Sequence, residues 1–320
     1  MRRLAPALIA ALAAAVLAAC GGGRDRGFMS FGTAPPGGAF FVVGGALVEV
    51  LNEAGADRGW QITAEATSGS QENIRRLTAG ELDFALSNAA ITYFAVRGTE
   101  GWDRAHPVQA VMTLAPNVAM FIARRGAGVE RIADLRGRRV VIGPAGAGFE
   151  FFVRPLLAAH GVGYEDFTPL NATQAAAVDM LADGSAAAAF LGGAVPTASI
   201  TQAAASQDVV FVPYEDAAMD RLAAEYPFFD RVTVPANTYR GQSAELHVLD
   251  TGSMHLITSA DRDEQLVYDV TRALYERREA VVERHAAGRA INARNAPRDT
   301  GTAFHPGAIR YYREIGIWKD

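Results

Sequence analysis

The alternation of apolar and polar residues predicts an α/β protein in which one short cassette occurs twice. Residues 28–31 form an apolar run, 32–38 a glycine- and proline-rich turn, and 39–51 an apolar segment of helical length. This pattern predicts a strand, a tight loop and a helix. Residues 139–160 repeat the order with a glycine loop in the middle. Two similar lobes are therefore predicted, each with a glycine loop at the carboxyl end of its first strand, where open α/β sheets bind ligands.

A second cassette follows each copy, namely a helix that ends in glycine and leads into a buried strand. It occurs at 77–87 and again at 181–191, with Gly80 and Gly184 at positions where a helix end favours a positive φ. The remaining pattern predicts strands at 60–66, 108–114, 118–123, 167–170, 209–212 and 232–234, and helices at 71–79, 89–97, 173–182 and 263–284.

The order of these elements predicts two lobes joined by a hinge. We assign residues 28–115 with about 250–285 to lobe 1, and 118–248 to lobe 2. A C-terminal segment, 286–320, is expected to pack on the lobes. Because the chain crosses between the lobes twice, we expect them to close on a ligand held by the facing loops.

The N-terminus has the pattern of a secretion signal. Arg2 and Arg3 precede an uncharged stretch that ends in small residues before Cys20, the only cysteine. Residues 1–20 resemble the signal peptide and lipobox of bacterial lipoproteins, in which the cysteine is acylated, and 21–27 a flexible tether. The resemblance implies an extracytoplasmic protein with a lipid anchor at Cys20. An ordinary signal peptide or a chance cysteine is the alternative.

Composition narrows the functional classes. Half of the chain is apolar and its net charge is −5, with arginines scattered along it, which gives no reason to expect a nucleic-acid partner. We find no nucleophile elbow, no His-Glu-x-x-His and no phosphate-binding Gly-x-x-x-x-Gly-Lys, and the six histidines are dispersed. The sequence predicts no catalytic residue, metal or cofactor, and an enzyme on this fold is the less favoured alternative.

Small polar residues follow three predicted strands at one rim of the first lobe. Each alone is typical of a cap or a turn, and Ser70 is expected to cap the helix that follows it. Together with the free N–H groups of helix starts at the glycine loops, they predict a pocket for an anionic group. Glu150 either complements a helix dipole or receives an ammonium group. The predicted ligand-binding residues are Thr33, Gly37, Gly38, Ser68, Gly69, Ser70, Asn73, Asn88, Gly146, Ala147, Gly148, Phe149, Glu150, Phe190 and Gly192.

Several short motifs follow one another in a fixed order along the chain. They are Gly32-Thr33, Gly37-Gly38, Ser68-Gly69-Ser70, Glu72-Asn73, Ala79-Gly80-Glu81-Leu82-Asp83, Asp134-Leu135-Arg136-Gly137, the loop from Gly143, Tyr226-Pro227-Phe228, Pro235-Ala236-Asn237-Thr238-Tyr239 and residues 304–312. Taken together, they resemble the TAXI family of solute receptors of TRAP transporters. The resemblance implies a two-lobe type II periplasmic-binding-protein fold with a hinge and an interlobe cleft. It also implies capture of a small organic anion or amino acid, glutamate-like or dicarboxylate-like, and delivery to a membrane permease.

Both glycine loops depart from the pattern of that family. Residues 34–36 read Ala-Pro-Pro and residues 145–149 read Ala-Gly-Ala-Gly-Phe, so the hydroxyl groups expected there are missing. The backbone N–H groups remain. A smaller, less charged or more apolar ligand than glutamate therefore stays open, as does a sensory role, in which a lipoprotein signals to a membrane sensor kinase.

Overall fold

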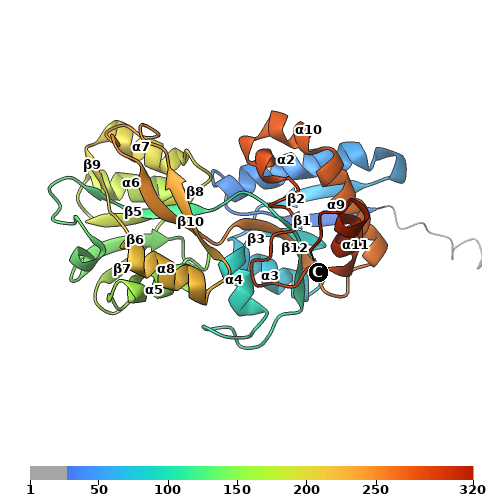
Figure 1. Ribbon diagram of the computed structural model, residues 1–320, viewed down its shortest axis with the longest axis horizontal. Coiled ribbons are helices and arrows are strands. Elements are labelled where there is room, and N and C mark those ends of the chain that lie inside the picture. Colours follow the sequence, from blue (N-terminus) through green and yellow to red (C-terminus); the bar gives the residue numbers. More distant parts are fainter. Residues whose placement is uncertain (1–26, 320) are drawn as a thin grey trace, which may run out of the picture.

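The computed structural model describes residues 27–319, and these form two lobes side by side (Figure 1). The predicted signal peptide and the Cys20 anchor lie outside the described residues, as does almost all of the predicted tether. No helix among the residues described here combines the length and the apolar character that a membrane span requires.

Lobe 1 is built on a five-stranded sheet with the order β2-β1-β3-β12-β4. Strand β1 is parallel to β2 and β3, whereas β12 is antiparallel to β3 and β4. The strands are β1 (Phe28–Gly32), β2 (Gln61–Glu65), β3 (Phe84–Asn88), β4 (Val108–Thr113) and β12 (Met254–Ser259).

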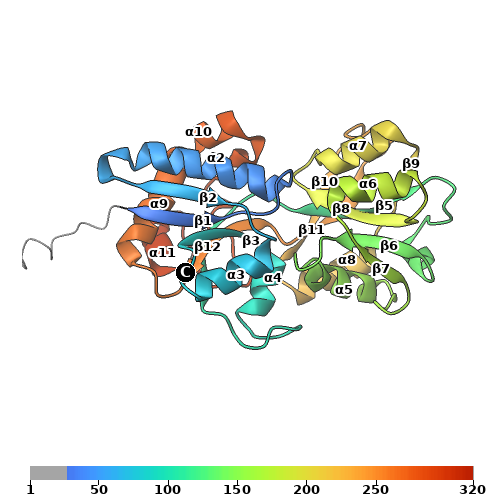
Figure 2. The same cartoon turned by 180° about the vertical axis from the view of Figure 1, so that it is seen from behind.

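Helices cover both faces of this sheet (Figure 2). One face packs against α2 (Ala39–Ala54), α9 (Glu264–Glu276), α10 (Arg278–Arg284) and α11 (Pro306–Glu314). The other packs against α3 (Ser70–Thr78) and α4 (Ala89–Ala95). The short 3-10 turns η1 (Ala56–Arg58) and η3 (Ala286–Ala290) complete the lobe, and η2 (Ile132–Leu135) belongs to lobe 2.

Lobe 2 is a second mixed sheet, with the order β10-β11-β5-β8-β6-β7 and with β9 paired to β5. Its parallel part is β8-β6-β7, which carries the second cassette. The strands are β5 (Val118–Arg124), β6 (Arg139–Gly143), β7 (Thr168–Asn171), β8 (Ala188–Gly193), β9 (Val209–Phe211), β10 (Phe229–Val234) and β11 (Leu246–Thr251). The helices are α5 (Glu150–Ala159), α6 (Gln174–Ala182), α7 (Ala198–Ser206) and α8 (Asp216–Glu225).

The described chain passes between the two sheets at 114–117 and at 252–253. These two crossovers lie side by side, because the Thr251 N–H donates to the Asn117 carbonyl at 3.0 Å. The apolar core is continuous across the junction, since one cluster of buried side chains includes residues of α3 and α4 together with most of lobe 2.

The prediction of one long helix over 263–284 is wrong in one respect. The helix breaks at Arg277, which ends α9 and begins α10 with φ −100° and ψ 23°. The change of direction brings Arg284 of α10 to α2, where it contacts Glu49 at 3.1 Å and also Glu53. Apolar periodicity continues through the break, so the pattern alone does not mark it.

Candidate ligand-binding site

The second glycine loop lies at the seam between the lobes, where it approaches the start of α3 in lobe 1. A Cβ placed on Gly148 would lie 2.9 Å from Ile91 Cδ1 and 3.1 Å from Gln71 Cγ. One placed on Gly69 would lie 3.7 Å from Ala147 Cβ. The structure thus brings the predicted residues Gly69, Ala147 and Gly148 together across the seam.

The seam continues between α2 and the loop after β8. A Cβ on Gly193 would lie 3.7 Å from Ala39 Cβ, so the first residue of α2 faces the end of β8. Gly37 and Gly38 precede α2 at this place, and Gly37 is exposed with φ +85°. Small residues on both sides allow the two backbones to come close.

Three helices begin beside this seam, and the N-terminus of each has no side-chain cap. They are α2, α3 and α5, whose N-cap residues are Gly38, Gly69 and Phe149. Backbone hydrogen bonding within α2 begins at Phe41 and within α3 at Asn73. The Gly38 N–H already donates to the Pro35 carbonyl and the Gly69 N–H to Thr67 Oγ1. The N–H groups of the first helical turn that follow them are donors at the positive end of a helix dipole, so the seam suits an anion or a carbonyl oxygen.

One carboxylate already lies at the start of α3. Glu72 Oε2 accepts from the Ser68 N–H at 2.8 Å, and this hydrogen bond lowers the pKa of Glu72. Ser68 itself is exposed. An anionic ligand at α3 would therefore meet the Ser68 hydroxyl and the N–H groups of the first turn beside an existing negative charge.

Thr33 and Asn73 are buried, and the Thr33 hydroxyl and Asn73 Nδ2 donate within lobe 1, whereas Asn73 Oδ1 has no hydrogen-bond partner. The Thr33 hydroxyl donates to the Glu65 carbonyl at 2.7 Å. Asn73 Nδ2 donates to the carbonyls of Thr33 (2.7 Å) and Leu86 (2.8 Å), which fastens β1 to β3. A Cβ on Gly32 would lie 2.7 Å from Asn73 Oδ1, so the glycine makes room for this amide. These two side chains therefore support the rim of the seam from the interior of lobe 1.

Ser70 and Asn88 are joined to each other. The helix α3 begins at Ser70 and its N-cap is Gly69, so the prediction that Ser70 caps α3 is wrong. Ser70 Oγ instead accepts from the Asn88 N–H at 3.0 Å. Asn88 Oδ1 caps α4 by accepting from the Ala90 N–H at 2.9 Å, and Asn88 Nδ2 donates to the Gly252 carbonyl at 2.7 Å. Asn88 therefore connects β3, α4 and the second crossover.

Aromatic rings support the second glycine loop. Phe149 packs against Phe152 with ring centroids 5.3 Å apart, and against Phe190 at 6.4 Å. A Cβ on Gly143 would lie 2.7 Å from the Phe149 ring, so this glycine permits the contact. Phe190 is 1% exposed and belongs to the core, whereas Phe149 is half-buried. Gly146 is exposed at the tip of the loop.

Sequence reasoning missed Gln174, which holds the end of β8. Its Oε1 accepts from the Gly192 N–H at 3.1 Å and from Ser199 Oγ at 2.6 Å, and its Nε2 donates to the Gly192 carbonyl at 2.8 Å. The predicted site residue Gly192 is thus fixed on both sides of its backbone. A glutamine as the first residue of a helix carries no local signal of such a role.

Glu150 lines a recess of about 310 Å³ beside the seam. Its walls come from both lobes: Glu100 and Gly101 follow α4, and Glu150, Phe151 and Arg154 lie on α5. Burial, together with the Glu150 charge, raises the pKa of neighbouring Tyr164 to about 12. The Glu150 carboxylate lies in the first turn of α5 and also borders this recess.

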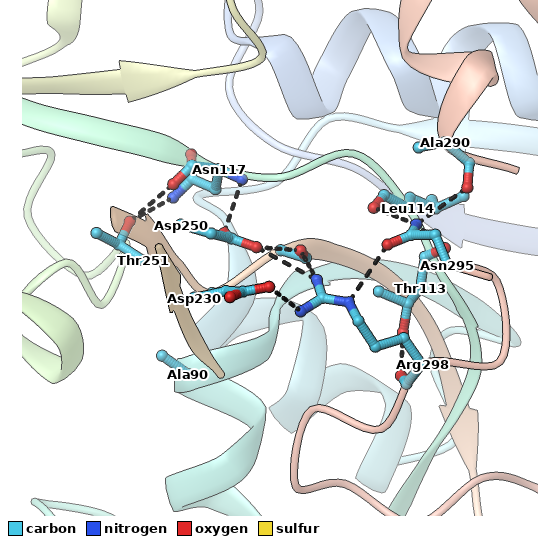
Figure 3. A network of polar contacts seen from close by, with 12 residues as sticks. Ala90, Thr113, Leu114, Asn117, Asp230, Asp250, Thr251, Ala290, Asn295 and Arg298 are labelled. Carbon is cyan, nitrogen blue, oxygen red and sulfur yellow. Dashed lines mark hydrogen bonds and ion pairs between the residues drawn. The ribbon is translucent and has the colours of Figure 1, made fainter. Parts of the chain in front are cut away.

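The two crossovers are linked through one buried carboxylate (Figure 3). Asp250 is 1% exposed; its Oδ1 accepts from the Asn117 N–H at 3.0 Å, and its Oδ2 contacts Arg298 Nη2 at 3.3 Å. Ser253 in the second crossover also donates to Asp250. Arg298 Nη1 lies 3.7 Å from Asp230 on β10, while the Arg298 carbonyl accepts from Thr113 Oγ1 at 2.8 Å. We refer to these contacts as the Arg298 network.

Aromatic side chains join the lobes beside these crossovers. Phe94 stacks on Phe151 with centroids 5.9 Å apart, Trp102 stacks on Phe151 at 5.9 Å, and Tyr93 meets Phe228 edge-on at 5.1 Å. We call this group the aromatic block; it consists of Tyr93, Phe94 and Trp102 from lobe 1 and Phe151, Tyr226 and Phe228 from lobe 2.

The block resists separation of the lobes. Phe94, Phe151 and Phe228 are 5%, 7% and 0% exposed. Exposing three such side chains fully to water costs roughly 5 to 9 kcal/mol. A ligand with micromolar affinity supplies about 8 kcal/mol in all. The free energy needed to separate the aromatic rings is therefore as large as the whole binding free energy of such a ligand.

Within residues 27–319, no three His, Cys, Asp or Glu side chains are arranged to hold a metal ion. Of the histidines, His255 is buried in β12, where its Nε2 lies 2.8 Å from Thr92 Oγ1. His305 caps α11 by accepting from the Gly307 N–H at 3.2 Å.

Comparison with solved structures finds the same fold in distant proteins. A binding-protein component of an ABC phosphonate transporter from Pseudomonas aeruginosa is 12% identical, with a TM-score of 0.53 over 82% of this chain and 79% of that one. A Xanthomonas citri protein bound to ATP is 9% identical, with a TM-score of 0.54 over 90% of this chain and 95% of that one. A Bordetella bronchiseptica protein is 12% identical, with a TM-score of 0.54 over 92% and 90%.

The two mixed sheets, the paired crossovers and the seam between the glycine loops agree with this likeness. Residues 31–316, nearly all of the described chain, match the NMT1-like family. The protein belongs to the NMT1-like family and has the type II periplasmic-binding-protein fold.

Proposed function

We propose that this protein is an extracytoplasmic solute-binding receptor that captures a small organic anion or amino acid between its lobes. The observation that carries the proposal is that the lobes meet at two places: the second glycine loop lies against the start of α3, where Gly148 approaches Gln71 and Ala147 approaches Gly69, and the start of α2 at Ala39 lies against Gly193 at the end of β8. A solute that contacts both sides of the seam binds the closed state better than the open one, and so drives closure.

The chemistry of the seam favours recognition by backbone groups. Apart from Thr33, the loops lack hydroxyl side chains, and the Thr33 hydroxyl, Asn73 Nδ2 and the Asn88 amide are engaged within the protein. The remaining donors are the exposed Ser68 hydroxyl and the N–H groups of the three uncapped helix starts, which suit a carboxylate or another compact anion. If the solute is an amino acid, Glu150 at the neighbouring recess is the acceptor for its ammonium group.

Delivery of the solute to a TRAP-type permease, and anchoring through an acylated Cys20, extend this proposal. Both rest on the sequence motifs rather than on the geometry of the lobes. Mass spectrometry of the mature protein tests the anchor; an unmodified Cys20 contradicts it. Copurification with a TRAP permease supports the transport partner, whereas copurification with a sensor kinase favours the sensory alternative.

Calorimetric titration of the purified mature protein tests the solute class. The panel comprises dicarboxylates, keto acids, amino acids and neutral analogues of each. We expect an anionic or zwitterionic compound to bind best. Glu150→Gln should leave the affinity for simple acids unchanged and reduce the affinity for an amino acid, with Glu130→Gln, an exposed carboxylate just before η2, as the control. Preference for a neutral or cationic compound would show that the anion site has been misread.

A further inference from the structure

The aromatic block is attached directly to the crossovers. Helix α4 begins at the second crossover, where the Ala89 N–H donates to the Ser253 carbonyl at 3.0 Å, and it carries Tyr93 and Phe94 toward lobe 2. On the lobe 2 side, Phe228 is followed by Phe229, which pairs with Thr251 at the end of β11. The block therefore lies close to the line about which the lobes can turn, where a rotation displaces atoms least.

The C-terminal segment ties the block to the Arg298 network. Arg298 holds Asp250 and Asp230 of lobe 2 while its own backbone is fastened to β4 (Figure 3). Three residues later, the Gly301 carbonyl accepts from Arg97 Nη1 at 2.9 Å. A Cβ on Gly301 would lie 2.5 Å from Tyr93 Cδ2 and 2.6 Å from Pro227 Cγ. The segment thus fills the space between α4 and lobe 2 and leaves no room for a side chain there.

The seam at the glycine loops has the opposite character. Two of its contacts join small residues, Gly69 to Ala147 and Gly193 to Ala39, and the Ile91 and Gln71 side chains meet Gly148, which has no side chain of its own. Because little apolar area is buried by such contacts, they separate at low cost, whereas parting the aromatic rings exposes large apolar surfaces.

We propose that the aromatic block, the Arg298 network and the two crossovers form one fixed joint, so that the lobes open only at the glycine-loop seam. The aromatic block stays packed in both the open and the closed state. This joint makes opening one-sided and admits a solute from the side of α2 and the loop after β8. The inference concerns the motion alone and does not depend on which solute binds.

The three tryptophans and the single cysteine allow a direct test without a ligand. In one variant, Cys20→Ser with Ala147→Cys, the new thiol reports on the seam. In a second, Trp60→Phe with Trp318→Phe, the remaining Trp102 reports on the block. We measure reaction of the thiol with iodoacetamide and quenching of Trp102 fluorescence by acrylamide, both under native conditions.

We expect the thiol at position 147 to react roughly a hundredfold faster than global unfolding allows, because local opening costs less than unfolding. Trp102 should stay shielded, and Phe94→Leu in the second variant should increase its quenching, which shows that the probe responds to loosening. Two results would overturn the proposal. One is Trp102 quenching as extensive as in the unfolded chain; the other is a thiol that reacts only at the rate of global unfolding. If no compound of the calorimetric panel binds, the proposed function fails, but the thiol and fluorescence measurements still test the fixed joint.

Discussion

Asn88 makes two kinds of contact with one buried side chain, so its removal should be costly. It caps α4 and bonds the second crossover at the Gly252 carbonyl, and it is only 4% exposed. We expect Asn88→Ala to lower the free energy of unfolding by about 2 to 4 kcal/mol, from the lost cap and the unpaired carbonyls. Urea denaturation measures this. Ser70→Ala, which removes only the acceptor for the Asn88 N–H, should cost about 1 kcal/mol. Equal losses in the two variants would contradict the assignment.

His255 predicts a specific dependence of stability on pH. Burial, with a smaller contribution from Arg298, lowers its pKa from 6.5 to about 3. The unfolded chain therefore takes up a proton first as the pH falls, so stability present at neutral pH is lost between about pH 6.5 and pH 3. This residue alone should make the free energy of unfolding about 2 kcal/mol lower at pH 5 than at pH 7.

Urea titrations at the two pH values test this contribution. His255→Gln should remove about that much of the pH dependence while retaining a polar partner for Thr92. His247→Gln is the matched control, since that imidazole is 51% exposed. An unchanged difference between pH 5 and pH 7 in His255→Gln would show that His255 does not contribute.

The position of single polar residues could be predicted from the sequence better than their bonding. Thr33 and Asn88 do lie at the ends of β1 and β3, because a polar residue after an apolar run marks the end of a buried strand, whereas Ser70 is the first residue of α3. Their partners come from distant segments: Asn88 bonds Gly252, and Asn73 holds β1 to β3. Such pairings depend on the tertiary fold, which local patterns do not encode.

At the scale of elements, Gly148 and Gly146 in one loop provide a matched pair. Both have positive φ, +90° and +73°, so alanine at either position costs about 1 kcal/mol of backbone strain. Only at Gly148 would the new methyl group meet Ile91 and Gln71 of the opposite lobe; at Gly146 it meets nothing within 4 Å. We expect Gly148→Ala to weaken solute binding by tenfold or more, on the order of 1.4 kcal/mol, and Gly146→Ala to leave it nearly unchanged. Calorimetry with the best solute measures the affinity of both variants. Equal losses of affinity would mean that the lobes do not meet at Gly148 in the closed state.

The repeated elements were predictable because their signals are local. A strand, a glycine loop and a helix, as in 28–51 and 139–160, follow from apolar runs and turn residues close together in the chain. The break at Arg277 and helices α8 and α11 were not predicted. Helix α11 packs against α9 and places Tyr312 so that its hydroxyl donates to the Val111 carbonyl at 2.9 Å, and these partners are far away in the sequence.

For the whole molecule, two carboxylates of the Arg298 network should differ sharply in importance. Asp250 is buried, so Asp250→Ala leaves Arg298 without its inner partner, and we expect a loss of about 3 kcal/mol in the free energy of unfolding. The Asp230 side chain is 64% exposed, and Asp230→Ala should cost less than about 1 kcal/mol. Urea denaturation compares them. A small loss in Asp250→Ala would mean that the crossovers do not depend on this carboxylate.

The hinge was predictable from the order of elements only in part. That the chain crosses twice could be inferred from the sequence of elements. That Arg298, almost 50 residues after Asp250, joins both crossovers could not, because an isolated arginine in a polar stretch has no distinguishing pattern. The aromatic block was hidden for the same reason, as its rings come from four separate segments.

Small-angle X-ray scattering during titration with the best solute from the calorimetric panel tests the central claim most directly. The account predicts a radius of gyration that falls as the site fills, in proportion to the bound fraction, and a smaller change in Gly148→Ala at saturation. A solute that binds at the seam with no change in the radius of gyration would contradict capture by lobe closure.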